Sequence, residues 1–332
     1  WVSENARMTA VNAGVVGEAK GIEGAFGGYP FPILNGNNEE KAWQVIWNHL
    51  TRWRGVSVTR RSSEVAVQTN GDYSLVTSQQ EAFFNFYNPE GGEEDLDNVI
   101  FYYLSFTQSP PRLAGGAILI HETLNQIINP RNGWGYNAGQ RRVRRAPQVA
   151  YDGPGTASDG MRTSDNFDMF NGAPDRYNWE LVGKKEMYIP YNSYKLTDRS
   201  LSYDQIIQAG HINQDYTRYE LHRVWHVRAT LKEGARHIYA QRDFYIDEDS
   251  WQASVIDHYD GRGELWRVAE AHNMQFYDQN VPWYAIEVLY DLLSGRYLAL
   301  GLTNEENQPY TFGVERQSRD YTPAALRRAG TR

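Results

Sequence analysis

Three histidines in the second half of the chain are the residues whose type and spacing first suggest chemistry. His222 and His226 lie on one face of an alternating segment, and His237 belongs to the next segment. Imidazole nitrogens are common zinc ligands, but residues four apart in a strand are about 13 Å from each other, so His222 and His226 cannot share an ion. Either of them with His237 across a hairpin remains an alternative. Separate, hydrogen-bonded histidines agree better with the pattern, and we predict no metal site.

Eight carboxylates in the same region carry the second candidate chemistry, glycoside hydrolysis. That reaction needs two acids about 5 to 10 Å apart in a groove. Most of these acids fall at turns, where Asp and Gly close hairpins, so we keep a hydrolase only as the third alternative. The eight are Asp243, Asp247, Glu248, Asp249, Asp257, Asp260, Glu264 and Glu270.

Familiar catalytic motifs are missing from the chain. It contains no GxSxG, no P-loop and no GxGxxG that follows a strand, so acyl transfer and nucleotide chemistry have no support. It contains no cysteine, which excludes disulfides, thiolate metal sites and a cysteine nucleophile. This is compatible with an oxidising compartment such as the periplasm. We expect neither a catalytic residue nor a cofactor.

The composition favours a globular β-protein that does not bind nucleic acid. Aromatic residues make up 14% of the 332 residues, with 23 Tyr and 10 Trp, and such rings favour pleated, half-buried surfaces and interfaces. The formal net charge is -8, and the arginines stand among acidic residues, which argues against a nucleic acid partner. No apolar run approaches the roughly 18 to 20 residues of a membrane-spanning helix.

The elements that must position these side chains can be read along the chain. Residues 1–37 are rich in Gly, Asn and Ala and predict an irregular N-terminal arm. Apolar residues at helical spacing predict one amphipathic helix over 38–53. We expect a single β-domain over 38–304, followed by a peripheral C-terminal tail over 305–332.

Alternating segments separated by polar turns predict an antiparallel meander. The dipeptide Asn70-Gly71 is a strong hairpin signal, and Ser109-Pro110-Pro111 must separate two strands because proline cannot donate to a ladder. A short helix is predicted over 286–293. The predicted strands cover 56–60, 64–68, 73–77, 99–108, 113–124, 219–231, 236–246, 251–259, 264–277 and 295–302.

The segment 139–149 contains a cluster of arginines: Arg141, Arg142, Arg144 and Arg145. Such a cluster is a candidate site for an anionic group or for docking of a partner protein. The alternative is an edge strand whose arginines pair with the many carboxylates of the chain. We favour the edge strand and keep the docking site open.

The segment 151–180 is rich in Gly, Pro and Asp but also in aromatic residues. Because those aromatics need burial, a long ordered loop or lid agrees better with this composition than a flexible linker. A short helix is expected within it, near 165–170.

Two long segments, 151–194 and 220–272, resemble a proteobacterial family of unknown function. They begin YDGPGTASDGMRTSDNFDMF and ELHRVWHVRATLKEGARHIY, and the resemblance covers nearly the whole chain. Members are often described as outer-membrane lipoprotein-sorting proteins and are similar in fold to LolA and LolB. The resemblance implies a mainly β fold, in which a curved, incompletely closed antiparallel β-barrel wraps around a few helices and leaves a hydrophobic cavity for acyl chains.

The same resemblance implies a location and partners. It implies export to the periplasm of a Gram-negative cell through a signal peptide that is absent from this chain, and a start at Trp1 agrees with a processed or truncated product. It also implies association with an RND-type exporter or an outer-membrane protein. Peripheral contact with a membrane is compatible with both.

A carrier of a lipid, a lipoprotein acyl chain or another hydrophobic molecule is the function expected from such a fold. Burying one methylene contributes ~0.8 kcal/mol, so a sixteen-carbon chain contributes on the order of 12 kcal/mol before binding costs. The alternatives are an accessory subunit that docks on an RND-type exporter and an envelope glycan or lipid hydrolase. The predicted ligand-lining residues, which could equally form a filled core, are Trp225, Val227, Ile238, Phe244, Val255, Trp266, Val268 and Met274.

Overall fold

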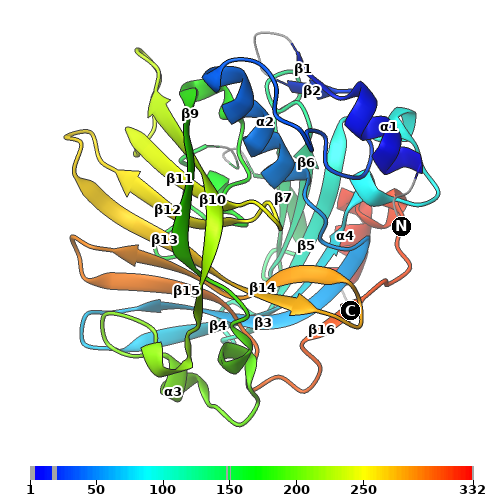
Figure 1. Cartoon of the computed structure of the whole chain (residues 1–332). Coiled ribbons are helices and arrows are strands. Elements are labelled where there is room, and N and C mark those ends of the chain that lie inside the picture. Colours follow the sequence, from blue (N-terminus) through cyan, green and yellow to red (C-terminus); the bar gives the residue numbers. More distant parts are fainter. Residues whose placement is uncertain (1–3, 17–20, 147–148, 150, 331–332) are drawn as a thin grey trace.

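One curved antiparallel sheet makes up most of the protein (Figure 1). Its strands are β3 (Ser57–Val67), β4 (Tyr73–Phe83), β5 (Val99–Ser109), β6 (Ala117–Thr123), β7 (Asn132–Asn137), β8 (Arg142–Arg145), β9 (Tyr177–Pro190), β10 (Tyr219–Leu231), β11 (Gln241–Asp247), β12 (Ala253–Tyr259), β13 (Leu265–Phe276), β14 (Val281–Asp291), β15 (Arg296–Leu302) and β16 (Tyr310–Phe312). The computed structural model describes residues 4–16, 21–146, 149 and 151–330.

The remaining elements are short and lie around this sheet. The α-helices are α1 (Glu4–Asn12), α2 (Asn38–Thr51), α3 (Tyr203–Ile206) and α4 (Pro323–Gly330), and a separate hairpin pairs β1 (Gly14–Val16) with β2 (Gly21–Glu23). The 3-10 helices are η1 (Asn85–Tyr87), η2 (Glu93–Asp95), η3 (Ser164–Asn166), η4 (Pro174–Arg176), η5 (Tyr194–Thr197), η6 (Gln214–Tyr216) and η7 (Ser318–Asp320).

The sheet consists of two consecutive meanders that meet at one strand pair. Strands β3 to β8 form the first meander and β9 to β15 the second, and the pairing of β15 with β3 joins them. Strand β16 adds a short third pairing to β3. Within the described residues β8 pairs only with β7 and β9 only with β10, so the curved sheet does not close. The predicted curved, incompletely closed antiparallel architecture is confirmed.

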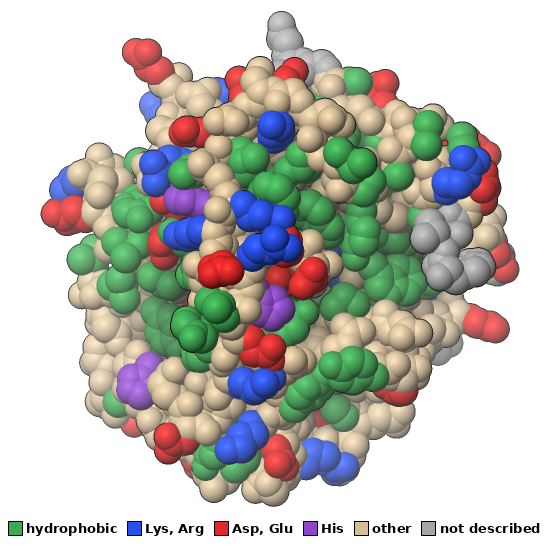
Figure 2. Space-filling view, in the orientation of Figure 1, with side chains coloured by type: hydrophobic (Ala, Val, Ile, Leu, Met, Phe, Trp, Pro, Cys, Tyr) green, Lys and Arg blue, Asp and Glu red, His purple; other side chains and the backbone are tan. Residues whose placement is uncertain are grey.

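Charged side chains protect one of the two open edges. Figure 2, which keeps the orientation of Figure 1, shows Lys, Arg, Asp and Glu side chains along the path of β9. Lys184, Lys185 and Glu186 of this strand are exposed. Charged residues on an edge strand disfavour pairing with another chain.

Helix α2 fills the concave side of the sheet. It begins at a capping box, in which Asn37 accepts the N–H of Glu40 and the Glu40 carboxylate accepts the N–H of Asn37. Its apolar residues, such as Val45 and Ile46, are fully buried against the inner faces of β9 to β15. The helix predicted over 38–53 is confirmed, with its end at Thr51.

Three smaller apolar clusters cover the convex side. The segment 194–216 packs on β3, β14 and β15. Leu326 of helix α4 and Tyr321 just before this helix pack on β4 to β7, and a third cluster lies on β9 to β12. Both faces of the sheet are thus largely buried, which explains why several strands read as nearly continuous apolar runs.

Several predicted elements differ from the observed ones. The helix predicted over 286–293 is wrong, because residues 286–291 belong to strand β14 and residues 292–293 lie in the turn that follows it. A short apolar run fits a buried strand as well as a helix, and here pairing with β13 and β15 on both sides decides the outcome. The strands predicted over 56–60 and 64–68 are one strand, β3. The strand predicted from residue 236 begins only at Gln241, and the sequence did not indicate β9.

Segments near both ends of the described chain pack against the sheet. Ile22, Phe26 and Phe31 from the N-terminal part lie in the core, as do Tyr321 and Leu326 near the other end. The division into an arm, a single domain and a tail stays a prediction. Among the described residues, no helix has the length and apolar character to cross a membrane.

Candidate functional site

A cavity of about 250 Å³ opens on the concave face of the first meander. Its floor is formed by β3 to β6 with parts of β14 and β15, and the loop of residues 151–167 covers it together with Ala146 and Val149. The apolar part of its wall contains Phe101, Ile118, Ile120 and Phe167. The rest of the wall is polar and charged, which distinguishes this cavity from a purely apolar core void.

Strand register brings the polar wall together from distant parts of the sequence. Glu287 lies opposite Leu300, and Leu300 lies opposite Glu64, so the three side chains form a row across β14, β15 and β3. Residues that are directly opposite in a sheet share a face. A second row runs from Arg60 through Gln80 and Ser105 to Ile118. The two rows place two carboxyl groups and a guanidinium on one inner surface.

Arg60 is held in place within this surface but keeps unused donor capacity. Its Nε lies 2.8 Å from Oε1 of Gln80, and its Nη2 also donates to that oxygen, whereas Nη1 is buried without a partner. Gly301 lies beside it in the left-handed region at a φ of 95°, where a Cβ would lie only 3.2 Å from the carbonyl oxygen of Ala285. The guanidinium stacks 5.3 Å from the ring of Tyr284.

The two glutamates of the row lie in the interior, and neither forms an ion pair with a described residue. Glu287 is 2% exposed and its Oε1 has no hydrogen-bond partner. Burial, with a contribution from the charge of Asp168, raises its pKa to about 8. Glu64 lies deep in the molecule but keeps part of its side chain accessible because it faces the cavity. Burial raises the pKa of Glu64 to about 7, although Arg162 and Arg60 oppose that shift.

Arg162 is the charged group that the covering loop contributes. Its Nη2 donates to the carbonyl of Thr156 at 3.2 Å, and its Nε is buried without a partner. In the described part of the chain, no carboxylate lies within ion-pair distance of its guanidinium. The cavity therefore contains two arginines whose hydrogen-bonding capacity is only partly used.

The covering loop is an ordered tongue. Gly155 donates its N–H to the carbonyl of Arg162 at 2.8 Å, and Ser164 donates its N–H to the carbonyl of Gly153 at 2.7 Å. Pro154 and Thr163 form an isolated antiparallel β-bridge. The single turn η3 stands where a short helix near 165–170 was predicted. The ordered loop expected over the start of 151–180 thus forms one wall of the cavity.

Buried ion pairs fix the tongue to the sheet. Asp165 lies 2.5 Å from Nη2 of Arg242 and 3.0 Å from Nε2 of His237. Burial alone would raise the pKa of Asp165, but Arg242 and His237 outweigh it and hold the pKa well below its usual value. Asp168 is paired with Arg52 at 2.5 Å and with Arg54.

A third anchor joins the tongue to β6 and β7. Arg131 donates to Glu122 at 2.7 Å and to the carbonyls of Val149 and Ser164 at 2.8 Å each. It also donates to the carbonyl of Asn171. Because Glu122 already binds Arg131, it is not available to neutralise the other arginines of the cavity.

Glu287→Gln is expected to alter the pH dependence of stability. The pKa of Glu287 is higher in the folded protein than in the unfolded chain. Between about pH 4.5 and 8, therefore, the folded protein keeps a proton on this carboxyl group and the unfolded chain does not. As a result, the free energy of unfolding falls as the pH rises through this range. The variant should lose that dependence. The free energy of unfolding of the variant minus that of wild type should therefore be about 2 kcal/mol larger at pH 8 than at pH 5. Urea denaturation at pH 5, 6.5 and 8 measures it.

The control for this experiment is Glu264→Gln, since Glu264 is exposed at a turn. It should leave the pH dependence of the unfolding free energy unchanged. Identical pH dependence in wild type and Glu287→Gln would show that Glu287 titrates normally.

The residues predicted to line a ligand cavity lie elsewhere. Val227 and Phe244 are fully buried in the core beside α2. Trp225 packs against the same core and stacks on Trp251. Ile238 is 39% exposed.

The other four of these predicted residues are also outside the 250 Å³ cavity. Val255 and Val268 belong to the convex cluster over β9 to β12, and Met274 packs on the convex cluster over β14 and β15. Trp266 is half-buried and donates its Nε1–H to Asp291 at 3.1 Å. The register of the sheet thus distributes the eight over both faces, and their role in ligand binding stays a prediction.

The arginine cluster is an edge strand. Arg142, Arg144 and Arg145 belong to β8, which pairs only with β7, and Arg141 precedes it. Arg145 donates to Asn132. Within the residues that the structure describes, none of the four forms an ion pair with a carboxylate. The predicted edge strand is confirmed. The carboxylate partners that we expected for its arginines are not found among the described residues. The role of these arginines in docking stays a prediction.

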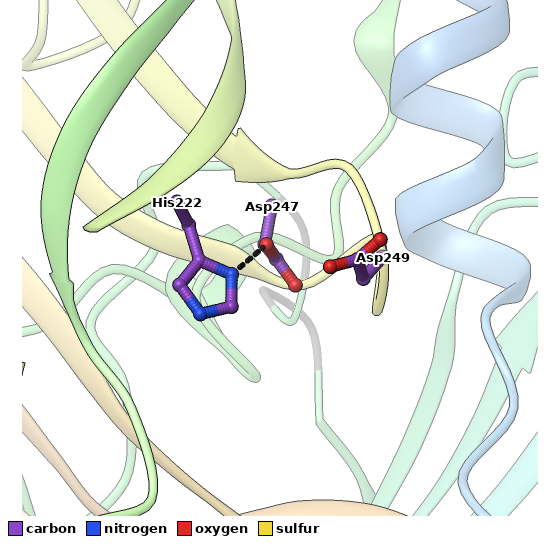
Figure 3. A group of neighbouring side chains, drawn as sticks. All are labelled: His222, Asp247 and Asp249. Atoms are coloured by element: carbon purple, nitrogen blue, oxygen red, sulfur yellow. Dashed lines mark hydrogen bonds and ion pairs between the residues drawn. The ribbon is translucent and has the colours of Figure 1, made fainter. Parts of the chain in front are cut away.

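Figure 3 shows His222 with Asp247 and Asp249, and the potential ligand atoms of the three residues all lie within 4.8 Å of one another. His222 Nδ1 is 3.0 Å from Asp247 Oδ1, while the N–H and the hydroxyl of Ser250 donate to Oδ2 at 2.9 Å and 2.6 Å. These bonds use both oxygens of Asp247. The closure of the turn after β11 therefore explains why these side chains lie close together.

The other two histidines considered above have carboxylates of their own. His226 Nε2 is 3.4 Å from Asp243 Oδ2, and His237 contacts Asp165 in the tongue anchor. Pairing with Arg228 at 2.8 Å and with His226 outweighs the effect of burial and lowers the pKa of Asp243 to about 2. None of the eight acids between residues 243 and 270 lines the cavity.

The predictions above do not include the charged residues of the cavity. A signal for them exists in the sequence, because Glu287 interrupts the apolar run Ala285–Tyr290 and Glu64 precedes an apolar residue in an alternating strand. Charged side chains are seldom fully buried without a partner. Identifying the pair as one site, however, requires the register of three strands.

Comparison with known proteins shows the family of this chain. A family model described as a protein of unknown function, DUF1329, matches residues 1–327. An uncharacterized protein of Pseudomonas aeruginosa is 60% identical over 331 residues, which cover 100% of this chain and 72% of that protein.

Two crystal structures share the fold. One is a domain of a proposed outer membrane lipoprotein-sorting protein from Vibrio parahaemolyticus, with 13% identity, a TM-score of 0.59 and coverage of 87% of this chain and 100% of that chain. The other is a DUF1329 family protein from Desulfovibrio piger, with 10% identity, a TM-score of 0.59 and coverage of 88% and 100%. At these identities the likeness concerns the fold alone. The match over residues 1–327, together with the relative from Pseudomonas, shows that this chain belongs to the DUF1329 family.

Proposed function

We propose that this protein is a periplasmic carrier or chaperone that binds a hydrophobic molecule, such as a lipid or a lipoprotein acyl chain, in the 250 Å³ cavity on the concave face of the sheet. The observation that carries the proposal is the cavity itself, which a curved sheet and an ordered tongue enclose between them. A carrier needs such an enclosed volume and no catalytic group.

The size and the apolar wall of the cavity favour a single chain as the ligand. Its volume lies just below the roughly 300 to 1,000 Å³ that is usual for small-molecule sites. Phe101, Ile118, Ile120 and Phe167 supply apolar contacts. At ~0.8 kcal/mol per buried methylene, a ten-carbon chain contributes on the order of 8 kcal/mol before binding costs.

Transfer between envelope partners is the second part of the proposal. The fold is shared with a domain of a proposed outer membrane lipoprotein-sorting protein, and the resemblance of residues 151–194 and 220–272 implies association with RND-type exporters. The ligand would therefore pass between the cavity and a membrane-bound protein of the envelope, with the protein itself in the periplasm.

Ser105→Phe is expected to abolish ligand uptake. Ser105 faces the cavity from β5 opposite Ile118, so a phenyl ring there would occupy the space of the ligand. Saturable binding of the uncharged dye N-phenyl-1-naphthylamine, followed by fluorescence, should weaken at least ten-fold. Native mass spectrometry of protein purified from its own host should show the loss of any co-purifying apolar molecule.

The matched control is Gln108→Phe, which adds the same ring to the same strand at an exposed position outside the cavity. It should bind the dye as wild type does. A wild-type protein without saturable binding, or equal binding by both variants, would contradict the carrier function at this cavity.

A further inference from the structure

The polar wall of the cavity has donors that no described residue satisfies. Nη1 of Arg60 and Nε of Arg162 are buried and have no hydrogen-bond partner among these residues, and Arg60 as a whole is only 8% exposed. An unpartnered donor inside a protein costs free energy, and guanidinium groups bind carboxylate and phosphate oxygens especially well because of their planar fork. Two such groups in one cavity indicate an anionic ligand group.

The acids of the cavity do not neutralise these arginines. Glu122 is engaged by Arg131. Burial raises the pKa of Glu64 and of Glu287 to about 7 and about 8, so both carry a proton for much of the time near neutral pH. A protonated carboxyl group is itself a hydrogen-bond donor. The cavity therefore has an excess of positive charge and of donors.

The approach to the cavity has the same sign of charge. An outer hollow of about 510 Å³ shares Arg131, Val149 and Pro154 with the wall of the cavity. Arg145 of the edge strand and Arg176 also line this hollow, against the single acid Asp152. Positive charge around an entrance raises the local concentration of anions.

The geometry points to an amphipathic anion as the ligand: we infer that Arg60 and Arg162 bind its carboxylate or phosphate head, while its apolar chain lies on Phe101, Ile118 and Phe167. This inference rests on the proposed carrier function and specifies its ligand class. Carboxylate and phosphate heads share the chemistry that a guanidinium recognises.

A series of ten-carbon ligands tests the inference on the intact protein. Decanoate, decyl phosphate and decan-1-ol have the same chain and differ in the head, and each can be measured by displacement of N-phenyl-1-naphthylamine. We expect wild-type protein to bind at least one of the two anions ten-fold or more tightly than decan-1-ol. Arg162→Met should reduce this ratio to about two-fold by weakening the binding of the anions. Arg112→Met, at an exposed arginine away from the cavity, should retain the ratio.

The possible failures are distinguishable. Equal affinity for all three ligands, or tighter binding of decan-1-ol, would overturn the anionic head while leaving the carrier function intact, and this result needs no variant. An unchanged ratio in folded Arg162→Met would remove Arg162 from the site. Competition by inorganic phosphate at the concentration effective for decyl phosphate would indicate a site for free anions. If no ten-carbon ligand binds, the carrier function fails together with the inference.

Discussion

Asp165→Ala is expected to destabilise the protein by about 3–5 kcal/mol, since it removes one partner of a buried ion pair. Arg242, which is 1% exposed, would keep its charge in the interior without the carboxylate that now lies 2.5 Å away. His237 would also lose its partner. Urea denaturation followed by tryptophan fluorescence measures the change in the free energy of unfolding.

Two controls show whether the loss comes from the unpaired charge. Replacing both partners, as Asp165→Ala with Arg242→Met, should recover much of the stability, because exchanging a whole buried ion pair for apolar residues is often nearly neutral. Glu264→Ala removes an exposed partner of Arg262 and should change the stability by less than about 1 kcal/mol. A loss below about 1 kcal/mol for Asp165→Ala would mean that the tongue is not anchored there.

The pH dependence of this anchor has a definite sign. The folded pKa of Asp165 is lowered, so its contribution to stability is fully present above the pKa of about 3.9 of an unfolded aspartate. It is lost as the pH falls from that value toward the folded pKa. The difference between wild type and Asp165→Ala should therefore shrink in acid.

Phe244→Ala is expected to cost about 3–5 kcal/mol of stability, because it would leave a cavity in a closely packed core. The Phe244 side chain is fully buried, and its ring centroid lies 5.3 Å from that of Phe170 and 5.5 Å from that of Trp179. Thermal and urea denaturation measure the loss. Binding of N-phenyl-1-naphthylamine to the protein that remains folded should be close to that of wild type.

Ile238→Ala is the control for this experiment. Both residues were predicted from sequence to line a ligand cavity, but Ile238 is 39% exposed, and its truncation should cost less than about 1 kcal/mol. If Phe244→Ala instead left stability intact and abolished dye binding, Phe244 would be a ligand-binding residue rather than part of the core.

Elements specified by local signals could be predicted from the sequence. The capping box at Asn37 and Glu40 and the apolar spacing after it specify α2. Polar turns, such as those at Asp260 and Asn70, separate the strands of the two meanders. These features act over a few residues and depend little on the rest of the molecule.

Elements that are decided by neighbours far along the chain could not be predicted from the sequence. Residues 286–293 read as a helix because an apolar run lacks a period of its own, and the strand state of residues 286–291 depends on β13 and β15. The residues of the candidate site could not be predicted for the same reason. Alternation assigns Trp225 to one face of β10, but whether that face meets a cavity, a helix or solvent depends on what packs there.

The candidate site shows this limit most clearly. Glu64 and Glu287 become neighbours only through Leu300, which pairs with both of their strands. The predicted arginine edge at Arg142–Arg145 needed only local alternation, whereas its position beside the hollow in front of the cavity required the full sheet.

The single junction between β3 and β15 also governs how the protein is made. Strand β3 is among the first to leave the ribosome and β15 among the last, so the cavity cannot exist on a nascent chain that lacks residues 296–302. Pairings of such high sequence separation fold slowly. Until the junction forms, two half-sheets with open edges are exposed to aggregation, and rapid capture by a chaperone during synthesis would be an advantage for this fold.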